Sequence, residues 1–597
     1  MFGRRLATLV ATTSLFASFV GGLGTTGCVD ADVEDGENDS FASDGKADGI
    51  TEGSREAMAV LALVNGPTLT AVELKNDAGV TIRVANNIMK KRNGADAQTG
   101  TADDDNFETL LELDKVPYVG PAAFNTLLAY AKAKGLFTDA GKIEVVFSPQ
   151  PAGATHTAKV AGLIRSAQKN IDVAMYSFSD AEVGAALADA VRRGVKVRFL
   201  FETAGSDKAI DLTVRASSKS GKLETAGVDV RYVNKILHHK FVLIDGPRDD
   251  AANAATGILV TGSANWSFGG AQTYDENTLF ITGSSRTNLA YQNEFNNLWE
   301  HSRDFVLATV LPYQTSMLRI DGSRLPTEDG IDPLFTLPNY TPGGTDGASW
   351  KVDTASTVMA DQWVAAIGRA QHSIHIASGH LRMRSVAEAL IAKRAASPNV
   401  EIKVYLDQQE YISASGHDAQ VAKVELCLST ATTDAAKRTC KANEFLFSKL
   451  VNDANIEVRV KSYAYRWDNS YAVQMHNKYM IIDSNELFSG SYNLSMNSEQ
   501  GTFENCMHVS GAANAGVIAK FESNFAKLWN TGRTEGVLAT VRNQISTAAS
   551  IPLVFTPVSL TMKEFTDLRT LIRSNCAVVD SQEYRSKAAT HRFCPRS

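Results

Sequence analysis

A histidine, a lysine two residues later and an aspartate five residues beyond the lysine occur twice in this chain of 597 residues, each time followed by Gly-Ser-x-Asn. In an extended strand the side chains of residues i and i+2 lie on one face, so each histidine and its lysine are predicted to point to the same side. One imidazole and one ammonium group would then bind a single anion. The two sets are His238, Lys240, Asp245, Ser263 and Asn265, and His476, Lys478, Asp483, Ser491 and Asn493.

These residue types suit attack on a phosphodiester. Its oxygens are anionic and its leaving alkoxide is poor, so a site must neutralise charge, attack phosphorus and protonate the leaving oxygen. Acid-base help from one histidine contributes only about 10²–10⁴-fold, so fixed cations and amides must supply much of the rest. We expect the lysines and asparagines of both motifs to hold the phosphoryl oxygens and the serines to help bind the phosphate.

The duplicated motif resembles that of the phospholipase D superfamily, whose members include phospholipases, cardiolipin hydrolases, nucleases and phosphatidyl transferases. The resemblance covers about residues 143–533. It implies a phosphohistidine intermediate, in which one imidazole attacks phosphorus while the other protonates the leaving group and then activates water or an alcohol. We assign the first role to His238 and the second to His476. By the same resemblance, Glu276 and Glu504 are expected to orient an imidazole.

The motif aspartates Asp245 and Asp483 complete the catalytic candidates and are taken as supports of the turn after each motif strand. We expect no metal ion or other cofactor, because the lysines supply the charge that magnesium would otherwise bring.

Strand-like and helical segments alternate around both motifs, and the second half repeats the order of the first. This alternation predicts an α/β fold with a largely parallel sheet covered by helices. We expect two α/β/α sandwich halves, related by a pseudo-two-fold axis that brings the motifs together. The predicted divisions are a signal peptide at 1–28, an acidic disordered tether at 29–50, a helical domain at 51–137, half 1 at 142–305, a linker at 306–350, half 2 at 351–535 and a C-terminal appendage at 536–597.

The N-terminus has the layout of a signal peptide, with Arg4 and Arg5 before an apolar stretch and small residues up to Cys28. Residues 26–28 resemble a bacterial lipoprotein cleavage box, so we expect lipidation of Cys28, with simple secretion as the alternative. The acidic stretch that follows has little to bury and predicts a disordered tether. The protein is therefore expected to be exported, to the periplasm or the outer surface.

The remaining cysteines agree with an oxidising compartment. Two pairs close in sequence, Cys427 with Cys440 and Cys576 with Cys594, are expected to form disulfides. Cys506 would be left over as a buried free thiol.

Within the helical domain, residues 116–121 and the flanking helices resemble a helix-hairpin-helix. Gly120 would allow the tight bend, and free amides at the next helix start would hold a phosphate, which in that family is usually part of DNA. A hairpin that only packs or binds a partner is the alternative, since the surrounding segment is acidic.

Three functions remain open. The chain would release head groups from glycerophospholipids at a membrane surface, cleave DNA or RNA as an endonuclease, or act as a non-catalytic surface binding protein. A net charge of −7 offers little of the counterion release that long nucleic acids reward, which favours the lipid. Tyr463, Tyr465 and Trp467 would form a lipid-facing lip or a platform for stacked bases. Because both motifs lie in one chain, we expect an active monomer.

Overall fold

The computed structural model of the chain describes residues 46–596, with the exception of 48–49, 52–54, 99–100, 102, 135, 138–141, 203–211, 234, 306–319, 321–324, 326–329, 346, 412–413 and 441–445. The predicted signal peptide with Cys28, and most of the predicted tether, lie outside these residues. None of the described helices is both long and apolar enough to span a membrane.

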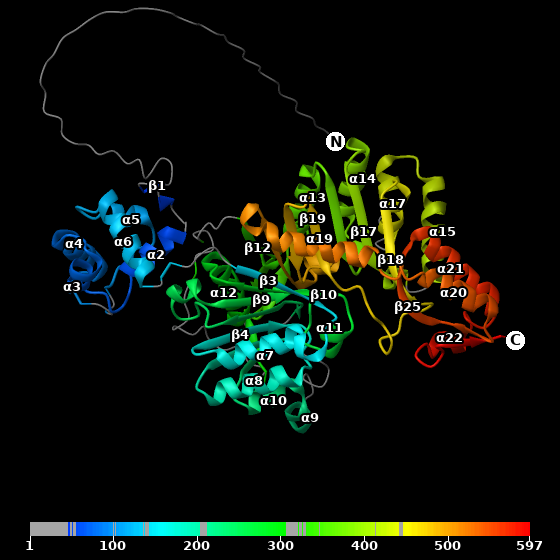
Figure 1. The fold of residues 1–597 in the computed structure, drawn as a ribbon, viewed down its shortest axis with the longest axis horizontal. Helices are drawn as coiled ribbons and strands as arrows, with labels where there is room; N and C mark the ends of the chain where they lie inside the picture. Colours follow the sequence, from blue (N-terminus) through cyan, green and yellow to red (C-terminus); the bar gives the residue numbers. More distant parts are fainter. Residues whose placement is uncertain are drawn as a thin grey trace, which may run out of the picture.

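The N-terminal helices form a small unit with its own apolar core, drawn in blue in Figure 1. Tyr118 has a φ of 71°, whereas Gly120 has a φ of −154°. The tight bend therefore lies at Tyr118 and not, as expected, at Gly120, whose extended backbone any residue adopts. The main helices of the unit are α2 (Arg55–Val64), α4 (Ile82–Arg92), α5 (Leu110–Asp114) and α6 (Pro121–Ala133).

An eight-stranded sheet carries the first motif. Its strands lie in the order β11-β6-β5-β4-β8-β9-β10-β3. Lys240 opens β8, and His238 lies just before it. The strands are β3 (Lys142–Ser148), β4 (Asn170–Met175), β5 (Lys196–Phe201), β6 (Asp229–Val233), β8 (Lys240–Ile244), β9 (Ile258–Gly262), β10 (Glu276–Thr282) and β11 (Ser302–Asp304).

A second eight-stranded sheet carries the second motif, in the order β12-β23-β20-β19-β15-β17-β18-β25. Read from its other end, this order matches the first sheet strand for strand, as the predicted pseudo-symmetry requires. The strands are β12 (Ile331–Phe335), β15 (Ser373–Ser378), β17 (Glu401–Asp407), β18 (Glu457–Ala464), β19 (Lys478–Ile482), β20 (Glu486–Gly490), β23 (Asn505–Ser510) and β25 (Val554–Thr561).

The two edge strands of the second sheet come from segments expected to lie outside it. Strand β12 falls in the predicted linker 306–350 and pairs with β23, whereas β25 falls in the predicted appendage 536–597 and pairs with β18. The linker and the appendage therefore each complete the second half, in the places that β3 and β11 occupy in the first.

The sheets are mixed and not largely parallel, which corrects the expectation from strand-helix alternation. In the first sheet β4, β5 and β6 are parallel, but β8, β9, β10 and β3 pair antiparallel. The segments that join β8 to β9 and β9 to β10 contain only short helical turns, and no long helix crosses the sheet there to bring the chain back in parallel.

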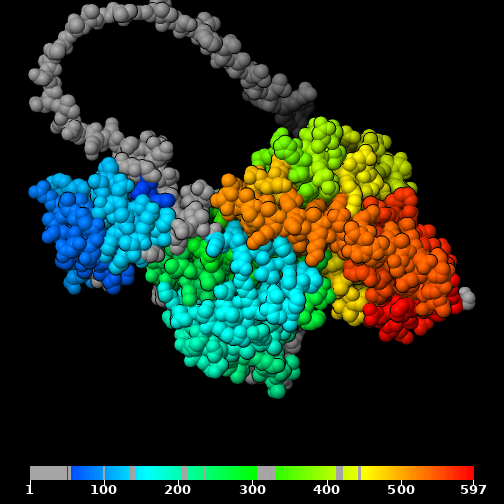
Figure 2. Space-filling view, in the orientation of Figure 1, coloured from blue at the N-terminus to red at the C-terminus, as the bar shows by residue number. Residues whose placement is uncertain are grey.

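A shared apolar core joins the two halves. It contains residues of both sheets and of α12 (Ser285–Glu300) and α19 (Ala515–Trp529), which lie between the sheets. The outer face of the first sheet is covered by α7 (His156–Ser166) and α8 (Ala181–Arg192), and that of the second by α13 (Val358–Arg369) and α14 (Arg384–Ala396) (Figure 1). Figure 2 shows the halves in broad contact, with the C-terminal residues at the opposite end from the helical unit.

Both predicted disulfides are present, between Cys427 and Cys440 and between Cys576 and Cys594. Cys506 is free and buried in β23, as expected.

Candidate active site

The backbone of each half holds the motif histidine of the other. The amide of His238 donates to the carbonyl of Phe503 at 3.0 Å, and the amide of His476 donates to the carbonyl of Asp275 at 3.0 Å. Each histidine therefore sits beside the strand that carries the glutamate of the opposite half.

The glutamates bond to the imidazoles across the same boundary. Nδ1 of His238 bonds to the carboxylate of Glu504 at 2.8 Å, and Nδ1 of His476 bonds to that of Glu276 at 2.5 Å. The two glutamates were predicted to orient an imidazole, and the structure adds that each one bonds to the histidine of the other half.

The two lysines close the site around the same rings. Nζ of Lys240 donates to Nε2 of His238 at 3.2 Å and to its carbonyl at 2.8 Å. Nζ of Lys478 bonds to Nδ1 of His476 at 3.2 Å and to its carbonyl at 2.6 Å. Both lysines are buried.

The charges of the two motifs act on one another. The pKa of His238 lies well below its usual value. Burial is the main cause, and the nearby Lys240, Lys478 and His476 lower this pKa further. Burial likewise lowers the pKa of His476, and lowers that of Lys240 to about 7. Imidazoles and ammonium groups of both motifs therefore lie close enough for their charges to act on one another, in a single site suited to an anion.

The motif asparagines lie half-buried after β9 and β20. Within the part of the chain that the structure describes, Oδ1 of Asn265 is buried and has no hydrogen-bond partner. The motif serines, expected to help bind phosphate, are instead bonded within the protein. Ser263 accepts from the amide of Asn277 at 2.9 Å, and Ser491 donates to Glu504 at 2.6 Å.

The motif aspartates are not part of the pocket, although they were counted with the catalytic candidates. Each lies at the end of its motif strand remote from the histidine, where its carboxylate accepts backbone amides that precede β4 or β15. They support the turn, as the sequence suggested. The amides are those of Gln168, Lys169 and Asn170 for Asp245, and of Gln371, His372 and Ser373 for Asp483.

Two asparagines that sequence reasoning missed join the halves beside each histidine. Nδ2 of Asn277 donates to Oδ1 of Asn477 at 2.9 Å, and Nδ2 of Asn505 donates to Nδ1 of His239 at 3.0 Å. His239 also bonds through Nε2 to Glu294 at 2.9 Å. The signal was present in the sequence, because an Asn follows each glutamate.

Acidic residues at the ends of β5 and β17 were also missed. Glu202 accepts the amide of Leu237 at 2.9 Å, and Asp407 accepts that of Met475 at 2.8 Å. Each fixes the residue just before a motif histidine. A sequence pattern would have found them: in each sheet, the acidic residue stands at the end of the strand that lies next but one to the motif strand.

Three further side chains face the histidines, and one of them is Tyr274, whose ring centroid lies 6.1 Å from that of His476. The ring of Tyr176 packs edge-on against His238 with centroids 4.5 Å apart. His380 lies close enough for His476 and His238 to lower its pKa. Tyr463 and Tyr465 form no lip, because both are buried.

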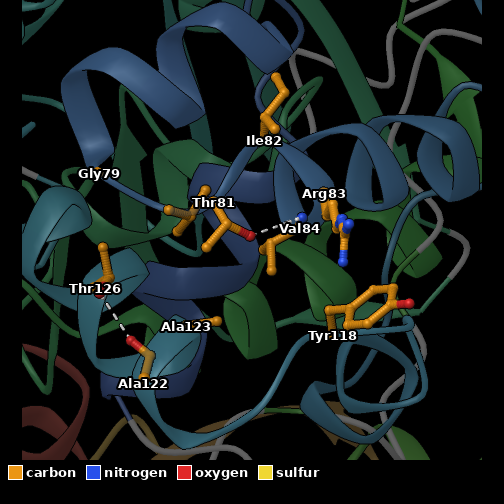
Figure 3. A pocket seen from close by; sticks show the side chains of 10 residues that line it. Gly79, Thr81, Ile82, Arg83, Val84, Tyr118, Ala122, Ala123 and Thr126 are labelled. Carbon is orange, nitrogen blue, oxygen red and sulfur yellow. Dashed lines mark hydrogen bonds between the residues drawn. The ribbon is translucent and has the colours of Figure 1, made fainter.

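A separate cavity of about 630 Å³ lies in the helical unit, between the start of α4 and the start of α6 (Figure 3). Arg83 and Tyr118 lie at one side of it, and none of its lining residues belongs to a motif. Among the described residues, no group of three or more His, Cys, Asp or Glu side chains is placed to hold a metal ion.

The chain matches a family model described as cardiolipin synthase, phospholipase D-like domain, over residues 160–299 and 363–529, more than half of its length. It is 32% identical over 167 residues to mitochondrial cardiolipin hydrolase of Xenopus laevis, which covers 26% of this chain and 71% of that protein. It is 30% identical over 157 residues to phospholipase D of Rickettsia conorii. That alignment covers 26% of this chain and 68% of the Rickettsia protein. A crystal structure of phosphatidylserine synthase from Haemophilus influenzae aligns with 75% of this chain and 93% of that one, at 12% identity and a TM-score of 0.42.

Proposed function

The chain belongs to the cardiolipin synthase, phospholipase D-like family and is a phosphodiester hydrolase, and on this premise we propose that it releases head groups from glycerophospholipids through a phosphohistidine on His238. The observation that carries the proposal is the crossed pairing of each imidazole with the glutamate of the other half. This pairing occupies Nδ1 of each ring, so that Nε2 of His476 is left for substrate and Nε2 of His238 is left once the ammonium of Lys240, 3.2 Å away, turns to the phosphate.

His238 is suited to attack. Its Nδ1 proton is directed at Glu504, and its Nε2 accepts from Lys240, so the Nε2 lone pair is present in the neutral ring. The lowered pKa keeps the imidazole neutral. As Nε2 bonds to phosphorus, the ring becomes positive, and the carboxylate of Glu504 stabilises that charge.

His476 then acts as the acid. The arriving phosphate anion and Glu276 favour its protonated form, and the Nε2 proton passes to the leaving alcohol oxygen. In the second step neutral His476 takes a proton from water, whose oxygen attacks phosphorus and releases His238. Lys240, Lys478, Asn265 and Asn493 hold the phosphoryl oxygens throughout.

A lipid substrate is supported by the relatives, which are named cardiolipin hydrolase and phospholipase D. The net charge of −7 points the same way. An endonuclease remains the second candidate because of the helical unit. There α6 begins at Pro121, the residue before it, Gly120, offers no side-chain cap, and Arg83 lines the same cavity.

The test incubates purified protein with phosphatidylglycerol vesicles, phosphatidylcholine vesicles or plasmid DNA, each in the presence of a chelator. We expect head-group release that is lost in His238→Ala and kept in His372→Ala, since His372 is exposed. With bis(4-nitrophenyl) phosphate, whose leaving group needs no acid, His476→Ala quenched in alkali should retain the phosphoryl group on His238, since the phosphorus–nitrogen bond survives alkali but not acid. Nicking of DNA without turnover of either lipid would refute the lipid assignment.

We also propose that the protein is exported and anchored through lipidated Cys28. The two disulfides support an oxidising compartment. Metabolic labelling with a radioactive fatty acid should mark the protein and fail to mark Cys28→Ser; equal labelling of both would exclude this anchor.

A further inference from the structure

The two halves of the pocket differ in polarity at equivalent positions. The strand registers define the equivalences, because Lys240 pairs with Met175 in the first sheet as Lys478 pairs with Ser378 in the second. The positions that differ most around the histidines are Tyr176 and Gly379, Ser177 and His380, Ile236 and Gln474, and Val233 and Lys461. Each first-half member of these pairs except Ser177 is aromatic or aliphatic.

The second half forms a polar corner beside His476. Asp407 accepts the amide of Met475 at 2.8 Å and donates its own amide to the carbonyl of Gly379 at 3.2 Å. Gln474 donates from its side chain to Oε1 of Gln409 at 3.3 Å. These bonds bring residues 379–382, 407–410 and 474–476 together.

His380 is available for a ligand in this corner. Its ring is half-buried, and among the described residues none forms a hydrogen bond to its nitrogens. Burial, then Arg382, Lys478 and both catalytic imidazoles, hold the pKa of His380 well below its usual value. The ring is therefore neutral and offers one donor and one acceptor.

The first half presents apolar groups in the equivalent places. Tyr176 lies with its ring against His238 and beneath Nζ of Lys240, 5.1 Å from the ring centre. Ile236, two residues before His238, is 43% exposed. These side chains match the apolar part of a lipid and offer little to a polar head group.

We infer that His380, Gln409 and Gln474 form the subsite for the leaving head group, and that this subsite selects head groups that carry hydroxyls, such as glycerol. The inference rests on the proposed function. Neutral imidazole and amide groups pair with hydroxyls as donors and acceptors. A quaternary ammonium group prefers aromatic rings and would be repelled by Lys478 and Arg382 nearby.

The position of the subsite agrees with the chemistry of the two histidines. In an in-line displacement the leaving oxygen departs opposite the attacking atom. With Nε2 of His238 as the nucleophile, the leaving alcohol lies on the side of His476, which donates the proton. The polar corner is on that side.

The test compares three substrates in mixed micelles or solution: phosphatidylglycerol, phosphatidylcholine and bis(4-nitrophenyl) phosphate. The variants are His380→Ala and Gln474→Ile, the second of which copies the first-half residue. Ser177→Ala is the matched control at the position equivalent to His380. We expect kcat/KM for phosphatidylglycerol to fall about 10-fold in both variants, with changes below about 2-fold for the other substrates and for the control.

Two outcomes would overturn the subsite alone: an equal loss on all three substrates, or an unchanged kcat/KM for phosphatidylglycerol in both variants. Thermal unfolding of each variant shows whether an equal loss comes from misfolding. If His380→Ala does not fold, the result for Gln474→Ile alone tests the subsite. If the wild type cleaves the nitrophenyl diester but neither lipid, the proposed function fails, and the subsite with it.

Discussion

Nδ1 of His238 and the carboxylate of Glu504 bond at 2.8 Å although 266 residues separate them in the chain. Ser491 and Thr502 also donate to this carboxylate, at 2.6 and 2.9 Å. The carboxylate of Glu276 differs, because within the described residues its Oε2 is buried without a hydrogen-bond partner. The carboxylate that bonds to His238 therefore accepts more hydrogen bonds than the carboxylate that bonds to His476.

Glu504→Gln should lower kcat by about 10²–10⁴-fold, because a neutral amide does not stabilise the positive ring that forms when His238 bonds to phosphorus. Steady-state kinetics measure the effect. Glu294→Gln is the matched control. Burial raises the pKa of Glu294 well above its usual value, so its carboxyl is already neutral and little should change. Equal losses in the two variants would contradict the assigned role.

Activity of the free enzyme should pass through a maximum near pH 7, because burial raises the pKa of Glu504 to about 7, which gives the acid limb, and the alkaline limb comes from Lys240. Burial lowers the pKa of Lys240 to about 7, so its ammonium charge is present below that pH and lost above it. Lys240→Arg keeps its charge at all accessible pH values. We expect its kcat/KM profile to have a lower maximum and an alkaline limb moved to higher pH. An unmoved limb would assign that titration to another group.

Asp245→Ala should weaken the fold and spare the chemistry. The substitution leaves three backbone amides without their acceptor, which costs about 1–3 kcal/mol of unfolding free energy. Urea unfolding measures that cost, and kcat per folded molecule should stay within about 2-fold of the wild type. A stable variant with a large loss of kcat would show that Asp245 takes part in catalysis.

Lys461→Val should destabilise the protein by about 3–5 kcal/mol, because it leaves Asp275 buried and unpaired. The ammonium of Lys461 lies 2.6 Å from that carboxylate. Under the pseudo-symmetry, Val233 corresponds to Lys461 and Phe503 corresponds to Asp275. Both Val233 and Phe503 lie in the shared apolar core. The double variant Lys461→Val with Asp275→Phe copies this pair and should recover most of the loss in urea unfolding. Failure to recover would show that the two sites pack differently.

The local spacing of residues was enough to predict the two sheets and that the motif histidines and lysines lie together. The period of a strand places His238 and Lys240 on one face, and the repeat of the pattern identified their partners. Edge strands were harder. Strand β12 contains Pro333 and β25 contains Pro557, which are tolerated at sheet edges but interrupt the strand pattern in the sequence.

Pairings between the halves were not predictable from either half alone. That Glu504 meets His238 and not His476 depends on how two folded sheets pack, and so do the contacts of Asn277 and Asn505. Only the residue types, a glutamate and an asparagine in sequence, were visible. The mixed character of the sheet was also missed, because alternation of strands and helices predicts only the parallel part, β4 to β6.

Each half is complete in its strands but borrows one glutamate from its neighbour. Two separate copies of such a unit would be inactive when apart, and their competence would rise and fall with concentration through mass action. Covalent fusion replaces that encounter with a high effective local concentration. We therefore expect the turnover of one molecule to be unaffected by dilution, which suits a catalyst that works singly on a membrane surface.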